Sequence, residues 1–276
     1  MSQQIIPIVM AVNSTYCFCA SVAINSIIEN KNRNTRYKIY ILFSSLMPSE
    51  IEKLESLSKE DVHIEAVNIS AYLPNRSDIL YPRAHFSKEM YYRWWISQLL
   101  PQHEKVLYLD CDTIVLRDLA ALFQIDLTGC TVAGVVDFAT PKVRNRIKTQ
   151  LGLSAEEYIN SGVLLVNTFE WNRKKCLQKC LHLLYEMPAL PCPDQDVMNM
   201  VCQDSIYLLP VQWNAQWHHF WDSSDDQLES PFMNYFQAAI AEPYILHYSS
   251  RIKPWNCVPN QYSDLYFSYT NNSPFY

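Results

Sequence analysis

The sequence predicts an α/β fold with a mostly parallel central sheet flanked by helices, and three observations support this class. Short apolar runs alternate with amphipathic helical stretches along the chain, which is typical of βαβ units. The run Val106–Leu109 shows no polar alternation, as expected of a strand covered on both faces. The chain has 276 residues, of which 49% are apolar, so one large core is favoured over two equal domains.

The amino-terminal part of the chain predicts strands and helices in alternation. Strands are expected at Ile5–Val12, Tyr37–Phe43 and Val62–Ile69, and helices at Tyr16–Asn30 and Pro48–Glu60. The first helix has apolar residues mainly three or four positions apart, and the second opens with a proline, which is favoured in a first helical turn. This order of elements indicates βαβ units and a parallel sheet.

An aromatic helix is expected next, at Glu89–Leu100, where Pro101 ends it. Arg93 is the one strong positive charge among its aromatic residues. An arginine in this place could hold a phosphate or a carboxylate. From its position alone, however, we expect Arg93 to lie along apolar surface with its charged end in water.

The second half of the chain continues with further strands and helices. Strands are expected at Thr131–Val136, Val163–Val166, Ile206–Leu209 and Tyr244–His247, and helices at Leu119–Phe123, Pro141–Gln150, Phe169–Met187 and from Asp194 onward. The helix at Pro141–Gln150 is basic and is expected to be a solvated face or a lid over the sheet edge. Aromatic residues recur beyond Trp255, so we divide the chain into a main domain, residues 1–255, and an aromatic tail, residues 256–276. The tail could cover the domain or contact a partner.

A pair of acidic residues follows the buried strand at Val106–Leu109. Asp110 and Asp112 are two positions apart, so in extended chain both carboxylates point to one side. Ligands bind at the carboxyl ends of strands in open α/β sheets, and paired carboxylates suit Mg²⁺ or Mn²⁺. An isolated pair of this kind can also simply begin a solvated turn. His247 ends a later strand and is a candidate nitrogen ligand, although a lone histidine is usually structural.

Other polar residues lie at strand ends or helix starts. Asp137 follows a strand and is expected on the same edge of the sheet as the acidic pair. Asn160 and Gly162 lie at the start of another strand, and the glycine allows a close approach of backbone. Asp194 and Gln195 follow a rigid Pro-Cys-Pro segment. The acidic residues there could act as helix caps, but the rigid entry favours an additional role.

Composition excludes several classes of function. The net charge is −6 and no block of lysine and arginine occurs, so a nucleic-acid partner has no electrostatic basis. The first residues lack the basic segment of a signal peptide, and no apolar run approaches the ~18 residues of a membrane span. The nine cysteines form no Cys-x-x-Cys pair, which indicates reduced thiols and a cytoplasmic location.

The motifs together resemble glycosyltransferase family 8, a group of retaining, metal-dependent sugar transferases that includes lipopolysaccharide galactosyl- and glucosyltransferases and glycogenin. The resemblance rests on the ordered segments YLDCD, NSGVLLVN, PDQD and LHYSSRIKPW and covers Ile5 to Trp255. It implies a GT-A fold, a UDP-sugar donor, Mn²⁺ or Mg²⁺, and a saccharide acceptor such as a bacterial cell-surface glycan. The expected reaction is the transfer of a hexose, with galactose or glucose favoured.

The resemblance also implies roles for individual residues. The metal ligands are Asp110, Asp112 and His247, and Lys253 reaches the diphosphate of the donor. The remaining donor-binding residues are Ala11, Asn13 and Tyr16 on the nucleotide side and Arg93, Asp137, Asn160 and Gly162 on the sugar side. Asp194 and Gln195 are the catalytic pair beneath the sugar ring. Gln195 is a poor nucleophile, so we expect retention by front-face attack through an oxocarbenium-like state.

The sequence departs from the family pattern in three places. Asn13-Ser14-Thr15 stands where many members carry an acidic residue that reads uracil, although the asparagine carbonyl can still accept the uracil N3–H. Ser249-Ser250 stands where a glycine is common. The tail lacks the basic aromatic terminus with which some members hold an anionic membrane. Peripheral contact with the inner membrane face and a homodimer through the aromatic tail therefore stay open.

Two other classes compete with the transferase. A phosphohydrolase of the haloacid dehalogenase type also begins with a strand and Asp-x-Asp, but it expects threonine or valine where this chain has Ile114. A catalytically inactive nucleotide-sugar-binding protein would keep the scaffold alone. The joint presence of both carboxylates with His247, Lys253 and Gln195 favours an enzyme.

Overall fold

The central sheet brings strands from the whole length of the chain into one layer. A computed structural model describes residues 4–74, 80, 87–216, 234, 237–239, 241–249, 253–256 and 261–276. Its strands are β1 (Ile5–Ala11), β2 (Arg36–Phe43), β3 (Val62–Asn68), β4 (Lys105–Leu109), β6 (Val132–Val136), β7 (Ile159–Asn167) and β8 (Ile206–Leu208). They lie in the order β3-β2-β1-β4-β7-β6-β8. Only β7 runs antiparallel to its neighbours, which confirms the prediction of a mostly parallel sheet.

A second, three-stranded sheet carries the predicted histidine to the acidic pair. It consists of β5 (Thr113–Val115), β10 (Ile245–His247) and β9 (Ala215–Gln216), with β10 in the middle. The antiparallel register pairs His247 with Thr113, the residue after Asp112. Residues far apart in the sequence therefore become neighbours at the carboxyl end of β4.

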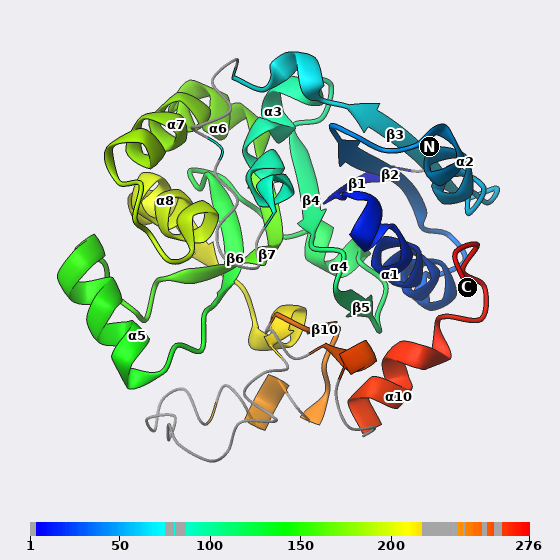
Figure 1. The fold of residues 1–276 in the computed structure, drawn as a ribbon. Coiled ribbons are helices and arrows are strands. Elements are labelled where there is room, and N and C mark those ends of the chain that lie inside the picture. Colours follow the sequence, from blue (N-terminus) through cyan, green and yellow to red (C-terminus); the bar gives the residue numbers. More distant parts are fainter. Residues whose placement is uncertain are drawn as a thin grey trace.

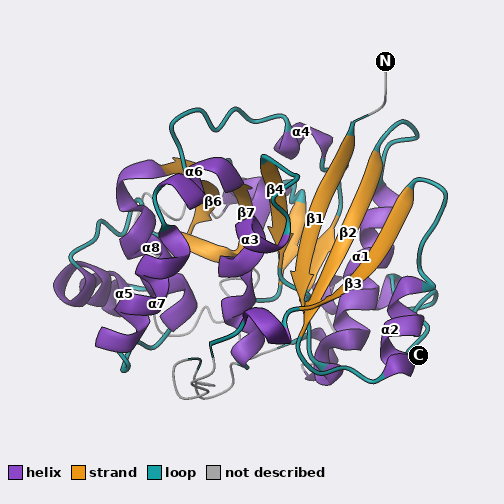
Figure 2. Ribbon diagram, turned by 90° about the horizontal axis from the view of Figure 1, so that it is seen from above, coloured by secondary structure: helices purple, strands orange, loops and turns teal. Residues whose placement is uncertain are grey.

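Helices cover both faces of the central sheet (Figures 1 and 2). They are α1 (Cys17–Asn30), α2 (Pro48–Glu55), α3 (Ile96–Leu99), α4 (Ala120–Phe123), α5 (Pro141–Arg146), α6 (Thr168–Arg173), α7 (Cys176–Glu186), α8 (Pro193–Cys202) and α10 (Gln261–Ser268). Short 3-10 turns occur at Ser14–Tyr16, Ser70–Tyr72, Lys88–Trp95, Gln203–Ser205, Val211–Asn214 and Pro254–Asn256, and a π turn at Ile147–Leu151. No helix among the described residues is long and apolar enough to cross a bilayer.

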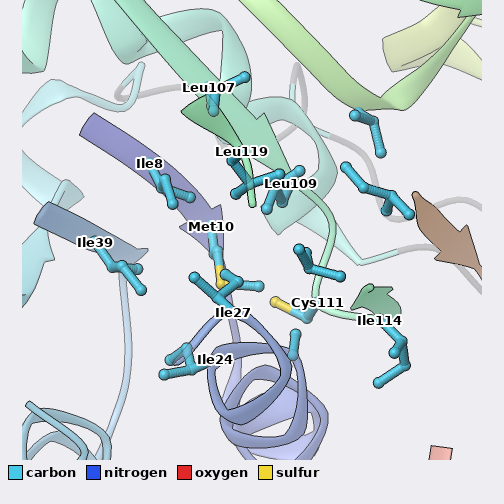
Figure 3. Close-up of a cluster of buried hydrophobic side chains, with 14 of the residues drawn as sticks. Ile8, Met10, Ile24, Ile27, Ile39, Leu107, Leu109, Cys111, Ile114 and Leu119 are labelled. Carbon is cyan, nitrogen blue, oxygen red and sulfur yellow. The ribbon is translucent and has the colours of Figure 1, made fainter. Parts of the chain in front are cut away.

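Alternate residues of each strand fill two separate cores. In β1, Ile8 and Met10 face α1, where they meet Ile24 and Ile27 (Figure 3). Val9 points to the opposite face and packs with side chains from the 3-10 turn Lys88–Trp95, from α3 and from α6 to α8. Continuous apolar strands are required here because both faces of the sheet are covered.

Four predicted helices differ from the observed ones. The helix expected at Pro141–Gln150 is α-helical to Arg146 and continues as a π turn from Ile147 to Leu151. The expected helix Phe169–Met187 is two helices, because the backbone turns at Lys175 with a φ of 55°. Nothing in the apolar spacing marks this break. The helix expected at Pro48–Glu60 ends at Glu55, and the aromatic segment is a 3-10 turn from Lys88 to Trp95 before α3 begins. Each prediction placed the element correctly and missed its end or its type.

The aromatic tail packs onto the main domain. Tyr266 in α10 is fully buried and its ring contacts Phe18 and Tyr248. The Ser273 hydroxyl hydrogen-bonds the Ser21 hydroxyl at 2.6 Å. The predicted connection at Pro82–Lys88 and the loops Trp213–Trp221 and Asp222–Glu229 lie largely or wholly outside the described residues.

Candidate active site

A cavity of about 340 Å³ lies at the end of the central sheet where β1, β4 and β6 finish. Among the described residues it is lined by every candidate that the sequence singled out: Ala11, Asn13, Tyr16, Arg93, Asp110, Asp112, Asp137, Asn160, Gly162, Asp194, Gln195, His247 and Lys253. The grouping follows from topology, because carboxyl ends of parallel strands meet at one edge and the antiparallel β7 starts there. The sequence thus identified the edge correctly.

The candidate metal ligands converge at the centre of this cavity. Ligand atoms of Asp110, Asp112 and His247 all lie within 4.8 Å of one another. The His247 Nε2 atom is 3.4 Å from Asp112 Oδ1 and 3.8 Å from Asp110 Oδ2. Two carboxylate oxygens and an imidazole nitrogen are a suitable donor set for Mn²⁺ or Mg²⁺.

Gly162 allows this convergence. A Cβ atom at position 162 would lie 2.2 Å from His247 Cε1 and 2.8 Å from Asp110 Oδ2. The Gly162 carbonyl accepts the Asp110 backbone N–H at 2.7 Å, which fixes the strand end against β7. The three ligands can therefore converge only because residue 162 has no side chain. The residues present fit a bound cation.

Asn214 fixes which nitrogen of His247 faces the carboxylates. The Asn160 side-chain oxygen accepts the Gly162 backbone N–H at 3.0 Å and also the Asn214 amide at 2.9 Å. The Asn214 oxygen must then face His247 Nδ1, 3.0 Å away, and accept its proton. The Nε2 lone pair is left pointing toward the acidic pair, as a metal ligand requires.

Arg93 occupies the interior of the site, and the expectation that its charged end reaches water is wrong. Its side chain is 4% exposed and donates to Asp110 Oδ1 at 2.9 Å and to the Ser161 carbonyl. Its guanidinium also lies 3.4 Å from Asp194 Oδ2 and over the ring of Tyr108. Burial alone would lower the pKa of Arg93, but these acidic neighbours raise it above its ordinary value. The charge is retained because the acids compensate it.

Lys253 and Asp112 form an ion pair at the mouth of the metal cluster. The Lys253 ammonium donates to Asp112 Oδ2 and to the Tyr248 carbonyl. Burial alone would raise the pKa of Asp112, but the charge of Lys253 is the largest opposing cause, and that pKa is held well below its usual range. Asp112 is therefore an anion at any physiological pH.

A hydrogen-bonded group around Gln195 forms one end of the cavity. The Gln195 oxygen accepts the Ser161 backbone N–H at 3.0 Å, so its amide nitrogen faces Asp137 at 2.9 Å. Asn160 also donates to Asp137, at 3.2 Å. Asp194 accepts the Ser161 hydroxyl at 3.1 Å, and burial raises the pKa of its carboxyl although Arg93 opposes this.

Asp196 lies beneath this group and is closed off from the cavity. Its carboxylate is fully buried and accepts both terminal nitrogens of Arg146, at 2.9 and 3.0 Å. It also accepts the Tyr158 hydroxyl at 2.5 Å, and that hydroxyl accepts Gln195 Nε2 at 3.2 Å. Arg146 comes from the segment Pro141–Gln150, which was expected to be a solvated face or a lid. This basic residue instead binds the buried Asp196.

The other end of the cavity is formed by the turn after β1. Asn13 caps the 3-10 turn, because its oxygen accepts the Tyr16 backbone N–H at 3.1 Å. Its amide nitrogen lies 3.3 Å from Glu89. Ala11 ends β1, and its carbonyl accepts the Cys111 thiol, which joins this turn to the acidic segment.

Sequence reasoning missed several polar residues of the site, among them Glu89, Tyr108, Arg146, Tyr158, Ser161 as a side-chain donor, and Asn214. Asn214 lies in a polar-aromatic stretch without periodicity, and Arg146 in a helix whose other basic residues gave no distinguishing signal. Glu89, Tyr158, Ser161 and Asn214 each contact a candidate residue from another part of the chain, and Arg146 contacts Asp196 beside them. Such pairing cannot be seen before the elements are packed.

Comparisons with known sequences found one family model and several relatives. The family model described as glycosyl transferase family 8 matches residues 7–258. General stress protein A of Bacillus subtilis is 27% identical over 88% of this chain and 85% of its own length. Lipopolysaccharide 1,2-glucosyltransferase of Escherichia coli K12 is 25% identical over 89% of this chain and 71% of its own length.

Two solved structures share the fold. The bifunctional glycosyltransferase WbbM superposes with a TM-score of 0.83 at 25% identity, covering 98% of this chain but 50% of that one. The galactosyltransferase LgtC, crystallised with donor and acceptor sugar analogues, gives a TM-score of 0.79 at 19% identity, covering 98% and 96%. The GT-A architecture expected from the sequence is thereby confirmed.

Proposed function

Since this chain belongs to glycosyl transferase family 8, we propose that it transfers a hexose from a UDP-sugar to a saccharide acceptor, with retention and with a divalent cation at Asp110, Asp112 and His247. The single observation that carries the proposal is the convergence of these three ligands within 4.8 Å in the cavity. A cation bound there, Mn²⁺ in preference or Mg²⁺, would neutralise the charge that develops on the departing UDP.

The chain's own cations support departure of the nucleotide. Lys253 is held at the cluster by Asp112, within reach of an anion that enters the cavity. The Arg93 guanidinium forms ion pairs with Asp110 and Asp194 and donates to the Ser161 carbonyl, so it orients these three acceptors. Groups placed in advance cost little reorganisation when charge shifts during the reaction.

The donor sugar is assigned to the end of the cavity that holds Asp137, Asn160, Asp194 and Gln195. Carboxylate and amide groups of this kind accept and donate to sugar hydroxyls. Gln195 is held by the Ser161 backbone N–H and by Asp137, so its neutral amide can stabilise positive charge at the anomeric carbon without forming a lasting bond.

Retention then proceeds by front-face attack, as the residues available suggest. Asp196 is the neighbouring carboxyl residue, but it is buried, hydrogen-bonded by Arg146 and Tyr158, and does not line the cavity. Mass spectrometry after incubation with a donor but no acceptor should find unmodified protein. A hexose adduct on Gln195 or Asp196 would contradict front-face attack.

The acceptor is proposed to be a saccharide of a bacterial cell-surface glycan, supported by the lipopolysaccharide glucosyltransferase among the relatives. We also propose that the protein acts in the cytoplasm. Peripheral membrane contact and a homodimer remain proposals that rest on the sequence alone.

A donor screen tests the proposed function. UDP release is measured from UDP-galactose and UDP-glucose with Mn²⁺, with Mg²⁺ and with EDTA. We expect release with the metals and at least a tenfold loss with EDTA or in Asp110→Asn. A matched control is Asp126→Asn, at an exposed acidic residue that does not line the cavity, which should behave as the parent.

The same assay separates the rival classes. Release of phosphate from simple phosphate esters, without UDP release, would support the phosphohydrolase and overturn the transferase. Tight binding of UDP with Mn²⁺ but no turnover with any hexose donor or added glycan would support an inactive binding protein. Nothing among the comparisons favours either rival.

A further inference from the structure

Glu89 is a buried carboxylate in the cavity that the transfer step described above does not use. It lies in the first turn of the segment Lys88–Trp95, is 8% exposed and lines the same cavity as the metal cluster. Within the described part of the chain it accepts only the Asn13 amide and the Tyr92 hydroxyl, both at 3.3 Å, and makes no ion pair. A carboxylate can accept about four hydrogen bonds, and burying it with few donors is costly. The site therefore has room for a donor from a ligand.

The place of Glu89 along the sheet edge indicates which part of the donor it meets. Asn13 follows β1, Asp110 follows β4 and Asp137 follows β6, and the strand order puts Asp110 between the other two. If the diphosphate lies at the metal cluster, the sugar and the nucleoside occupy opposite ends. The Asp137 end suits sugar hydroxyls. The Asn13 end combines an aromatic ring, Tyr16, with the Glu89 carboxylate and suits a planar base.

The Asn13 amide is oriented by the backbone. Its oxygen accepts the Tyr16 N–H as a cap, so its nitrogen must face Glu89. The pair presents a carboxylate acceptor beside an N–H donor. Uracil presents the complement, an N3–H donor flanked by carbonyl acceptors, whereas cytosine presents an acceptor at N3. Cytosine N3 carries a lone pair and no hydrogen, so it could not donate to the buried carboxylate and would face it at an energetic cost.

We propose that Glu89 accepts the N3–H of the donor's uracil and makes this site select uridine over cytidine nucleotides. The inference rests on the proposed function, because it requires the diphosphate at the metal cluster. It assigns the N3–H of the base to a carboxylate from the segment before α3 and not to the Asn13 side-chain oxygen, which accepts the Tyr16 N–H. Asn13 then positions Glu89 and donates to a neighbouring uracil carbonyl.

Calorimetric titration with Mn²⁺ and UDP, CDP, GDP or N3-methyl-UDP tests the inference on the parent and on Glu89→Gln. A hydrogen bond to a charged group corresponds to about a ten- to hundredfold change in affinity. We expect the parent to bind UDP that much more tightly than CDP or N3-methyl-UDP. In Glu89→Gln, UDP affinity should fall by a similar factor while N3-methyl-UDP affinity stays nearly constant.

Glu50→Gln is the matched control. Glu50 is equally buried, accepts from Ser14 in the same turn and from the Met47 N–H, and does not line the cavity. It should leave the preference for UDP over CDP unchanged, with melting temperatures measured for both variants.

The outcomes separate the two claims. If the parent binds UDP but binds N3-methyl-UDP, CDP or GDP as tightly, the role of Glu89 is overturned and the proposed function stands. If the parent binds no uridine nucleotide with Mn²⁺, the proposed function itself fails. Should Glu89→Gln not fold, the comparison of UDP with N3-methyl-UDP in the parent decides alone.

Discussion

At the scale of single residues, the candidate site depends on the missing side chain at Gly162. We predict that Gly162→Ala weakens Mn²⁺ binding about ten- to hundredfold, because the new Cβ would displace His247 or Asp110 from the cluster. Manganese titration followed by electron paramagnetic resonance measures the change. Gly134→Ala is the control: its Cβ would crowd Ile159 in the core, so it should reduce stability and leave metal affinity unchanged. Equal metal affinity in Gly162→Ala and the parent would contradict the proposed ligand set.

Three of the predicted acidic site residues that the structure brings to one cavity share one property. Asp110 and Asp137 directly follow β4 and β6, and Asp112 lies in the short turn between β4 and β5. A parallel sheet places strand ends together whatever the details of packing. Arg93 was placed wrongly from its position alone, because the acids that compensate its burial come from β4 and α8. Asn214 could not be identified, because its role exists only through contacts with Asn160 and His247.

At the scale of elements, the junction between α6 and α7 shows what apolar spacing does not report. The spacing Leu177, Cys180, Leu184 continues a helical pattern, yet Lys175 takes a left-handed conformation that ends one helix and begins the next. We predict that Lys175→Gly raises the free energy of unfolding by about 0.5–1 kcal/mol, since glycine adopts positive φ without steric cost. Lys174→Gly, at an ordinary φ of −84°, should lower it by a similar amount. Urea unfolding measures both, and a loss of stability in Lys175→Gly would contradict the assignment.

Asp118 joins the end of α1 to the start of α4. It accepts the Asn32 N–H at 2.7 Å, the Ala120 N–H at 2.9 Å and the Tyr37 hydroxyl at 3.0 Å. Burial alone would raise the pKa of Asp118, but these donors outweigh it and lower that pKa. A depressed pKa in the folded state means that the stabilisation is present above the unfolded value, about 3.9, and is lost as pH falls below it.

The corresponding variant should therefore show a pH-dependent effect. We expect Asp118→Asn to reduce the free energy of unfolding by about 1–3 kcal/mol at pH 7. The reduction should be smaller at pH 3, which is below the pKa of about 3.9 that the carboxyl has in the unfolded chain. Urea unfolding at the two pH values gives the comparison. Asp126→Asn serves as the exposed control. A loss that is the same at both pH values would show that the charge of Asp118 is not the cause.

At the scale of the whole molecule, the two cores explain how one sheet positions a site from elements spread along the chain. The sequence predicted the sheet because its strands are apolar on both faces, a local property. Local patterns could not predict that the pairing of β10 with β5 brings His247 to the acidic pair, because these strands lie more than a hundred residues apart in the sequence. Only the family resemblance implied that these three residues share one site. Whether residues 256–276 form a separate unit stays a prediction about domains, but their packing has an energetic consequence.

The tail contributes a side chain to the core that contains α1, so its loss should be felt by the domain as a whole. Tyr266 is fully buried against Phe18 and Tyr248, and truncation of a large core aromatic typically costs about 3–5 kcal/mol. We predict a loss of this size in a single cooperative transition for Tyr266→Ala. Tyr276→Ala, at a residue 86% exposed, should change stability by less than about 0.5 kcal/mol. Because Tyr248 directly follows His247, weakening the tail should also reduce Mn²⁺ affinity. Full stability and metal binding in Tyr266→Ala would show that the tail is only an appendage, because a shared core cannot lose its largest contact without cost.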